Sequence, residues 1–380
     1  MSKTIIGRLN NLDKYIQSKW EEHYWKFLMK YEDKLDWNML SRNPNITMEM
    51  IENSPDKPWD WNWISKNPNI TMEMIENNPD KPWDWAFISV NPNLTMEIIE
   101  KYPDKPWNWY RISQNSNITM EIIENSPNKP WDWRYISSNP NLTMEMLEKY
   151  LNEDWNWPFG ISSNPNITME MIDKYPDKPW SWHNLSNNQN ITMEFIEKYR
   201  YKPWSRYAIL NKKDITIQSI EEYSDEPWIW QYISGNTNIT MEMIEKYPDK
   251  PWDWSRISYN PNITMEIIEN NPTKPWKWYS ISENPNITME FIEKYRYKPW
   301  DWNGISYNPN LTMEMIENNP DKHLYWVGIS QNKFTKEKEL FYKKYYRIYI
   351  ATFRLQQYFN RMYDNPNYLF CRTRLEKLFS

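Results

Sequence analysis

Short apolar clusters alternate with polar turns along most of the chain. Residues 70–93 read ITMEMIENNPDKPWDWAFISVNPN, and close variants of this phrase follow one another through the sequence. Thr71 is a good helix N-cap, and Glu73 in the first turn complements the helix dipole. The first part of the phrase therefore predicts a helix of barely two turns that ends near Asn77.

The second part of the phrase predicts another short helix. Pro82 suits the first turn of a helix, where its missing N–H is not needed. The Asn-Pro-Asn turn at 91–93 ends the pattern, because the residue before a proline avoids helical geometry. We expect this helix over residues 82–90. Helices this short are unstable alone in water, so every copy must bury its apolar face on the copies beside it.

The phrase repeats with a nearly constant period. Its second tryptophan, or the residue in that place, occurs at Trp37, Trp61, Trp85, Trp109, Trp133, Trp157, Trp182, Arg206, Trp230, Trp254, Trp278, Trp302 and Trp326. Each interval is 24 residues except the one after Trp157, which is 25 because of an additional residue in the phrase WPFGIS. Such a period is typical of solenoids. We therefore predict an all-α fold, an α-solenoid of about twelve two-helix repeats with helical caps at both ends.

Outside the repeats the pattern changes at both ends of the chain. Residues 1–36 predict an N-terminal helical cap, residues 37–330 the tryptophan-rich repeats with a partial last copy, and residues 331–380 a basic helical C-terminal segment. One repeat is irregular, because residues 206–221 lose the Asn-Pro-Asn turn and Arg206 replaces the tryptophan. We expect the solenoid to bend there or to make a contact.

One side of the second helix differs in every copy. On a helical wheel Trp85 and Ile88 share the side that hardly changes, whereas Ala86, Phe87 and Val90 share the side that varies. The varying positions are rich in tyrosine, arginine and tryptophan, which often anchor interfaces. The candidate interaction residues are Trp63, Phe87, Tyr110, Arg111, Arg134, Tyr135, Tyr207, Tyr232, Arg256, Tyr259 and Tyr279. The alternative interpretation is a solvent-exposed face whose residues vary between copies because no contact constrains them.

The 26 tryptophans and the paired glutamates also suggest chemistry, but their repetition favours structure. Aromatic ladders can stack bases, yet tryptophan at a fixed place in each copy is what a thin core would use. Glu73 and Glu76 lie at i, i+3 and could act as acid and base. Because the pair recurs in nearly every copy, we interpret it as an acidic ridge, partly offset by the lysine of the Asp-Lys-Pro-Trp phrase.

Nothing specific to an enzyme stands out in the sequence. His23, His183 and His323 lie far apart, and the five glycines form no phosphate-binding loop. The single cysteine, Cys371, excludes a disulfide within the chain and a cysteine-based metal site. We expect no catalytic residue, no metal and no cofactor.

Charge is distributed unevenly along the chain. The net charge is −6, of which residues 331–380 carry +7 and the remaining residues −13. The acidic repeats would repel phosphate, so nucleic acid is expected at the tail if anywhere. An aromatic stripe in the tail instead favours docking on the last repeat. It comprises Tyr342, Tyr345, Tyr346, Tyr349 and Phe353.

The ends of the chain bear on location. The first residues lack the continuous apolar segment of a secretory signal, and no run of 18 apolar residues could span a membrane. We expect an intracellular protein that is not secreted and has no membrane partner.

The repeating phrase NPNITMEMIE resembles the variant leucine-rich repeat, whose units carry a similar Asn-Pro-Asn followed by threonine, glutamate and paired aliphatics. The resemblance covers roughly residues 37–335 and implies a right-handed superhelix of short helices, related to HEAT arrays. Some members of that family carry a cysteine-ligated iron–sulfur cluster before the repeats. This chain has no matching cysteine, so the resemblance implies no cluster here.

The tryptophan-rich unit also looks similar to repeat proteins of mimivirus-type giant DNA viruses. In the tail, residues 351–379 resemble a C-terminal segment of those proteins, with a degenerate IQ-like helix, then Asn-Pro, then Cys-Arg. This resemblance implies a host cytoplasm, viral factory or virion location and no known activity.

Together these patterns predict a non-enzymatic protein-interaction scaffold. Two alternatives stay open: a structural component of a viral particle or factory, and nucleic-acid binding through the basic C-terminal segment.

Overall fold

Two-helix repeats make up most of the chain, as the sequence predicts. The computed structural model describes residues 3–215 and 227–364, and the regular elements in these residues are all helices. The described chain divides into two compact bodies. The repeat body comprises residues 34–308 and 321–333, and the terminal body comprises the residues before 34, residues 309–320 and the residues after 333.

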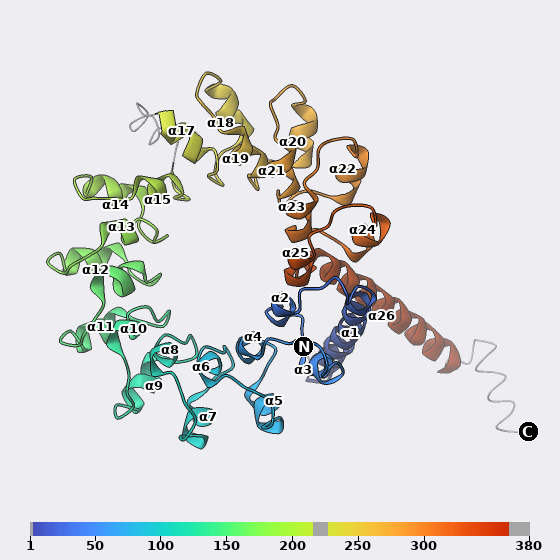
Figure 1. Cartoon of the computed structure of the whole chain (residues 1–380), viewed down its shortest axis with the longest axis horizontal. Coiled ribbons are helices and arrows are strands. Elements are labelled where there is room, and N and C mark those ends of the chain that lie inside the picture. Colours follow the sequence, from blue (N-terminus) through green and yellow to red (C-terminus); the bar gives the residue numbers. More distant parts are fainter. Residues whose placement is uncertain (1–2, 216–226, 365–380) are drawn as a thin grey trace, which may run out of the picture. The chain divides into compact units, whose positions relative to one another are not determined.

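A regular repeat contributes a first helix and a second helix, and we number the repeats 1 to 13 by their second helices (Figure 1). The second helices are α2 (Trp37–Ser41), α4 (Trp61–Lys66), α6 (Trp85–Ile88), α8 (Trp109–Ser113), α10 (Trp133–Ile136), the π-helical turn η1 (Trp157–Ile161), α13 (Trp182–Leu185), α15 (Arg206–Leu210), α17 (Pro227–Ile233), α19 (Trp254–Tyr259), α21 (Trp278–Ser282), α23 (Trp302–Tyr307) and α25 (Trp326–Gln331). The described first helices are α3 (Met48–Glu52), α5 (Met72–Asn77), α7 (Met96–Lys101), α9 (Met120–Asn125), α11 (Met144–Lys149), α12 (Met169–Lys174), α14 (Met193–Lys198), α18 (Met241–Lys246), α20 (Met265–Asn270), α22 (Met289–Lys294) and α24 (Met313–Asn318). Two long helices, α1 (Lys3–Lys30) and α26 (Thr335–Asp364), flank them in the sequence.

Side-chain caps decide where both kinds of helix begin. Thr71 caps α5 as predicted, with its hydroxyl accepting a hydrogen bond from a backbone N–H of the first turn at 3.2 Å. The predicted start of the second helix was wrong, because α6 begins at Trp85 rather than at Pro82. Asp84 is the N-cap, and its carboxylate accepts a hydrogen bond from the N–H of Phe87 at 3.0 Å. This cap satisfies a free N–H of the first turn, which Pro82 cannot do.

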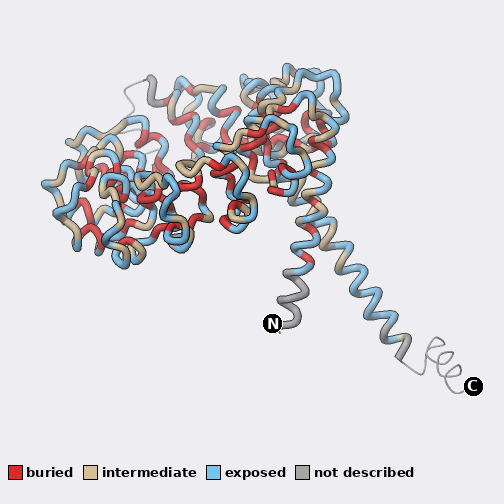
Figure 2. Tube along the Cα trace, turned by 60° about the horizontal axis from the view of Figure 1, so that its bottom comes forward, coloured by how far each residue is buried: buried red, intermediate tan, exposed pale blue. Residues whose placement is uncertain are grey.

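The core lies between the first and second helices. One aliphatic side chain from each helix and one from the turn between them are buried in every regular repeat, as at Ile88, Leu94 and Ile99, which are at most 2% exposed. Buried residues alternate with exposed turns along the whole array (Figure 2).

Tryptophans fill the space between neighbouring repeats. The rings of Trp85 and Trp107 meet edge to face, with 5.0 Å between their centroids, and the pair recurs as Trp133 and Trp155. The Trp107 indole N–H donates a hydrogen bond to the carbonyl of the residue five positions earlier at 2.8 Å. Lys105 lies over the Trp85 ring, 4.8 Å from its centroid. Aromatic pairs of this geometry add to the stability that their buried area provides.

Buried asparagine and serine side chains join each repeat to the one before it. At the joint between repeats 4 and 5, the Asn139 amide donates to the carbonyls of Ser113 and Asn115, at 2.9 and 3.2 Å. One repeat later, the Ser137 hydroxyl accepts a hydrogen bond from the backbone N–H of Asn156 at 2.9 Å. These groups are fully buried or nearly so, and their bonds pair buried polar groups of one repeat with those of the next.

The same joint closes the repeat body into a ring. The Asn43 amide of repeat 1 donates to the carbonyls of Ser330 and Asn332 in repeat 13, at 2.9 and 3.0 Å. The Ser330 hydroxyl accepts from the N–H of Asp36 at 2.9 Å, in the same register as an internal joint. Lys34 lies over the Trp326 ring at 5.3 Å, as Lys105 lies over Trp85. We call this joint between α25 and α2 the seam, and through it the first and last second helices of the described residues contact each other (Figure 1).

Repeat 8 replaces two of the joining residues. Leu210 stands in the place of the serine and Lys212 in the place of the asparagine. Lys212 is 1% exposed, and its ammonium donates to the carbonyl of Asn188 in the preceding repeat. Burial lowers the pKa of Lys212 to about 8, against the opposing influence of Asp214. Asn236 of repeat 9 still donates to the carbonyls of Leu210 and Lys212, at 2.6 and 3.1 Å, so the array continues through this repeat.

The terminal body pairs the two long helices. The Trp20 ring of α1 meets the Phe341 ring of α26 at 5.5 Å between centroids, and Tyr345 meets Tyr15 at 6.5 Å. We expected the aromatic stripe of the tail to dock on the last repeat. It packs on α1 instead, because α1 offers an aromatic face, while Glu337 near the start of α26 accepts a hydrogen bond from the first N–H of α24 at 2.6 Å.

Ion pairs connect successive first helices. Lys101 pairs with Glu76 of the preceding first helix at 2.8 Å, and Lys149 pairs with Glu124 at 2.9 Å. The prediction that the lysine of the Asp-Lys-Pro-Trp phrase offsets the acidic ridge was therefore wrong at these positions. That lysine, for example Lys105, covers a tryptophan ring, and the lysine at the end of the next first helix neutralises the ridge.

Candidate interaction face

The varying positions lie on the inner row of the repeat body. The second helices form this row and the first helices the outer row (Figure 1). In α8 the constant residues Ile112 and Ser113 are fully buried, whereas Tyr110 and Gln114 are exposed. Because the buried side of each second helix faces the core, its varying side faces the inside of the ring.

All the candidate residues reach the surface on this side. Trp63, Phe87, Arg111 and Tyr232 are half-buried. The other candidates are exposed, namely Tyr110, Arg134, Tyr135, Tyr207, Arg256, Tyr259 and Tyr279. Tyr279, the most exposed of the tyrosines among them, is 64% exposed. These exposures show that other side chains of the described residues do not fill the inner side.

The first cluster of the face runs through repeats 1 to 4. The Arg42 guanidinium lies 3.8 Å from the centroid of the Trp63 ring, which meets the Phe87 ring at 5.9 Å. Arg111 continues the stack, 4.7 Å over Phe87, and donates to the carbonyl of Ala86 at 3.0 Å. Two aromatic rings thus lie between two arginines along the inner row, each side chain covered in part by the next.

A second cluster occupies repeats 8 to 10. The Tyr207 hydroxyl donates a hydrogen bond to the Tyr232 hydroxyl, and the Arg256 guanidinium lies 4.6 Å over the Tyr232 ring. The hydrogen bond to Tyr232 is the main cause that raises the pKa of Tyr207. Arg256 is also 3.4 Å from the Asp253 carboxylate. Tyr259, in the same helix as Arg256, and Tyr279 in α21 lie outside this cluster.

A third cluster lies in repeats 4 to 6 and includes a residue that the candidate set missed. Tyr110 and Tyr135 pack with 5.3 Å between ring centroids. The Arg134 guanidinium beside them lies 3.2 Å from Asp132 and 3.7 Å from Asp154, and the hydrogen bond to Asp132 raises its pKa. Phe159, at the place in η1 that Tyr135 occupies in α10, is 71% exposed.

The additional residue of repeat 6 explains the exposure of Phe159. It converts the second helix into a π-helical turn, in which the N–H of Ile161 donates to the carbonyl of Asn156, five residues back, at 2.8 Å. The turn can pack on the preceding repeat because residue 160 is glycine; a Cβ there would lie 2.4 Å from the Cβ of Ser137. The 25-residue interval was the sequence signal that could have identified Phe159.

These residues line an open hollow of about 560 Å³ on the inner side. Its walls carry the Tyr110, Tyr135 and Phe159 rings, and its polar groups include the Gln114 and Asn156 side chains. The two carboxylates beside Arg134 compensate the charge of its guanidinium.

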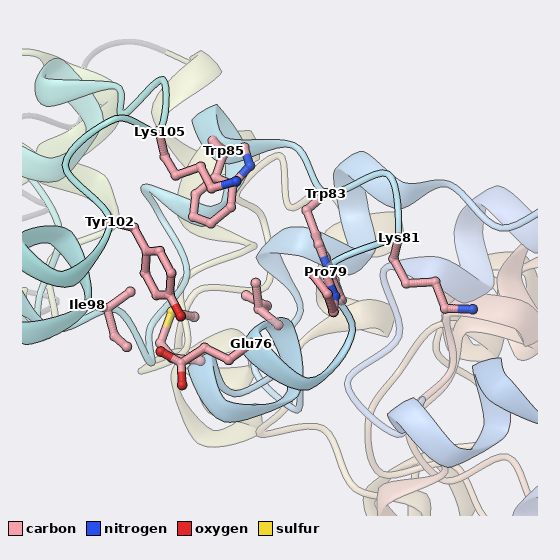
Figure 3. Close-up of a pocket in the computed structure, with 10 residues that line it drawn as sticks. Glu76, Pro79, Lys81, Trp83, Trp85, Ile98, Tyr102 and Lys105 are labelled. Atoms are coloured by element: carbon pink, nitrogen blue, oxygen red, sulfur yellow. The ribbon is translucent and has the colours of Figure 1, made fainter.

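A smaller hollow of about 100 Å³ lies elsewhere, between α5 and α7 (Figure 3). Tyr102, Trp85 and the stem of Glu76 surround it, and Lys105 extends along the Trp85 ring. Glu76 already forms an ion pair with Lys101. We therefore interpret this hollow as a gap in the packing between neighbouring repeats.

The other candidate groups each have their own surroundings. His23 lies in α1, 3.6 Å from Glu337, and His183 is exposed in α13. Cys371 lies outside the described residues. Across 3–215 and 227–364, no three histidine, cysteine, aspartate or glutamate side chains come together as metal ligands would. Among the described helices, none has the length and apolar character needed to cross a membrane.

Comparison with known proteins gives no assignment. No family model, curated protein or solved structure matches this chain.

Proposed function

We propose that this protein is a non-enzymatic scaffold that binds a protein partner on the inner side of its ring. The interaction face consists of the varying residues of the second helices. One observation carries the proposal: aromatic and arginine side chains are exposed at these positions and stack from one repeat to the next.

Two properties of the interaction face favour a binding role over a solvent-exposed face whose residues vary without constraint. Exposed tyrosine and arginine are the residues most often found as interface anchors, and they lie here side by side rather than singly. Their mutual stacking also holds them in place before a partner arrives, which lowers the entropy that binding must overcome.

A triple variant tests the proposal. Tyr207→Ser, Tyr232→Ser and Arg256→Ser remove the second cluster, whose residues are exposed or half-buried, so the fold should persist. Partners captured from the producing cell and identified by mass spectrometry should then be lost or reduced more than about tenfold.

The matched control is Tyr201→Ser with Tyr297→Ser. Both tyrosines are 73% exposed but lie in turns outside the face. Capture should be unchanged in this control. Equal capture by the triple variant and the control, with unchanged thermal melting, would remove the face as the binding surface.

The tail supports a second candidate function, binding of nucleic acid. Between residues 340 and 361 it carries five basic and no acidic residues, and Lys343, Arg347, Arg354 and Arg361 fall in one narrow sector of α26. Arg347→Gln with Arg354→Gln should weaken binding of a single-stranded 20-mer and flatten its salt dependence. Lys174→Gln with Lys294→Gln, on the first helices, is the control. No measurable binding at low salt would exclude this function for the tail.

A further inference from the structure

We propose that the hollow in repeats 4 to 6 binds a proline-rich peptide segment in the polyproline II conformation. The inference rests on the proposed function, because it names the chemistry of a partner for one part of the interaction face. Its residues, Tyr110, Tyr135 and Phe159, belong to the third cluster and not to the cluster used in the test above.

The repeat that forms this hollow is unlike the others. It is the 25-residue copy, and its π-helical turn is a geometry that short helices rarely adopt and that often marks functional sites. The turn brings Phe159 to 71% exposure beside two other exposed rings. The carbonyl of Pro158 accepts a hydrogen bond from the Asn184 amide at 2.8 Å, so the turn is integrated with the next repeat.

The spacing of the rings fits one backbone conformation. Tyr135 and Phe159 occupy the same place in neighbouring second helices, which pack about 8–10 Å apart. A polyproline II chain rises about 3.1 Å per residue with three residues per turn, so every third side chain returns to the same side after about 9 Å. Prolines three residues apart would therefore meet the Tyr110–Tyr135 pair and Phe159 in turn.

The polar groups fit the same ligand. A proline-rich segment has carbonyls that need donors and few N–H groups that need acceptors. The hydroxyls of Tyr110 and Tyr135 and the Gln114 amide provide donors at the rim. Aromatic-lined grooves are the usual sites for such segments, because the preformed helix loses little entropy on binding. Addition of a strand is excluded for the described residues, which contain no sheet edge.

Charge argues against acidic ligands. Arg134 is the cationic group among the residues that line the hollow, and Asp132 and Asp154 already pair with it. A phosphate or an acidic peptide would compete with both carboxylates, whereas a neutral segment would leave the ion pairs intact.

The test measures binding of fluorescein-labelled decaproline to the full chain by fluorescence polarisation. A labelled Gly-Ser decapeptide serves as the flexible control ligand. We expect saturable binding of decaproline, no binding of the Gly-Ser peptide, and at least a tenfold loss of affinity in Phe159→Ser and in Tyr135→Ser. Tyr201→Ser, the same change at an exposed site outside the face, should bind like the wild type.

Deletion of Gly160, the residue by which this repeat exceeds 24, provides a sharper variant. It restores the 24-residue repeat, so an ordinary helical turn should form and thermal stability should be kept or increased, while decaproline binding is lost. Binding that survives the deletion or Phe159→Ser would overturn the proposal, as would a complete lack of decaproline binding. Displacement of bound decaproline by maltohexaose at equal concentration would assign the hollow to sugar rings and also overturn it.

The outcomes separate the two proposals. If decaproline does not bind but the Tyr207, Tyr232 and Arg256 variant loses its partners, the interaction face stands and the assignment of the hollow fails. If decaproline binds through Phe159 while that triple variant keeps its partners, the hollow stands and the continuous face fails.

Discussion

The seam and the joint at Lys212 each depart from the ordinary joint between repeats, but in opposite ways. At the seam no first helix links repeat 13 to repeat 1 along the chain, yet Asn43, Ser330 and Lys34 make the same contacts as their counterparts in internal joints. At repeat 8 the chain is continuous, yet the serine and asparagine are replaced by Leu210 and Lys212. The comparison shows that the side chains define a joint and that chain continuity is not required.

Removing a tryptophan from an internal joint should have the largest effect. Trp133→Ala deletes the ring that packs edge to face on Trp155 and should lower the free energy of unfolding by about 3–5 kcal/mol, measured by urea denaturation. At the seam a leucine, Leu35, takes the place of the Trp155-type residue, so Leu35→Ala should cost less, about 2–3 kcal/mol. An unchanged unfolding curve for Trp133→Ala would mean that the ring does not contribute to packing.

The next prediction compares equal bonds at the two kinds of joint. Asn43→Ala removes a donor from the buried carbonyl of Ser330 and Asn139→Ala removes one from the buried carbonyl of Ser113, and each should cost about 2–3 kcal/mol. The N–H of Asp36, which is bonded to Ser330, should also exchange with solvent faster in Asn43→Ala. If Asn139→Ala lowers the free energy of unfolding and Asn43→Ala leaves it unchanged, the seam is open in solution.

Repairing the joint at repeat 8 should stabilise the ring. Lys212→Asn combined with Leu210→Ser restores the two joining residues and removes a buried ammonium, which should raise the free energy of unfolding by about 1–3 kcal/mol. Thermal melting of the double variant is the measurement, and the same exchange of lysine for asparagine at the exposed Lys213 is the control. A lower melting temperature in the double variant would indicate that Lys212 contributes a contact that asparagine cannot replace.

The same lysine predicts a dependence on pH. Its pKa falls from 10.5 in the unfolded chain to about 8 in the folded protein, so between these values the unfolded state binds more protons. Stability should therefore rise as pH increases from about 8 to about 10.5, and the penalty of the buried charge should be complete below pH 8. Subtracting the profile of Lys212→Asn isolates this contribution from that of surface groups. A flat difference between the two profiles would contradict the lowered pKa.

The smallest effect is expected at the outer row. Lys149 and Glu124 form an ion pair between first helices, and their side chains are 52% and 35% exposed. Lys149→Ala should change the free energy of unfolding by less than about 1 kcal/mol, because water and salt screen such pairs. If Lys149→Ala lowered the free energy of unfolding as much as Asn139→Ala, the first helices would contribute as much to the joint as the buried asparagines do.

Local rules in the sequence predicted much of the fold. Thr71 was identified as a cap because its place before an apolar run is sufficient, and the period identified the repeats. The start of α6 was misplaced because Pro82 and Asp84 both carry helix-start signals, and only the structure shows that the aspartate hydrogen bond closes the turn. The lysine that neutralises the acidic ridge was misassigned. Two lysines follow a ridge glutamate such as Glu76 in the sequence, one in the Asp-Lys-Pro-Trp phrase and one at the end of the next first helix, and the sequence does not show which of them pairs with it.

Two features depended on contacts that sequence patterns do not specify. The aromatic stripe at Tyr342 and Tyr345 indicated that α26 needs a partner but could not choose between the last repeat and α1. For the seam, a signal was present in the sequence: Asn43 in the first repeat and Ser330 in the last keep the buried polar residues that an exposed end would not need. The exposure of Phe159 followed from a single additional residue, whose effect on the helical turn requires the backbone geometry.

Ring closure also constrains how this sequence can change over generations. In an open solenoid, gain or loss of a whole repeat alters only the length. Here the joint between Asn43 and Ser330 depends on the number of repeats between them, so removal of one 24-residue unit would separate the two residues by about the width of a helix. Nearly identical coding segments favour unequal recombination, which adds and removes such units. We therefore expect the number of units to be inherited unchanged while the residues of their inner face diverge.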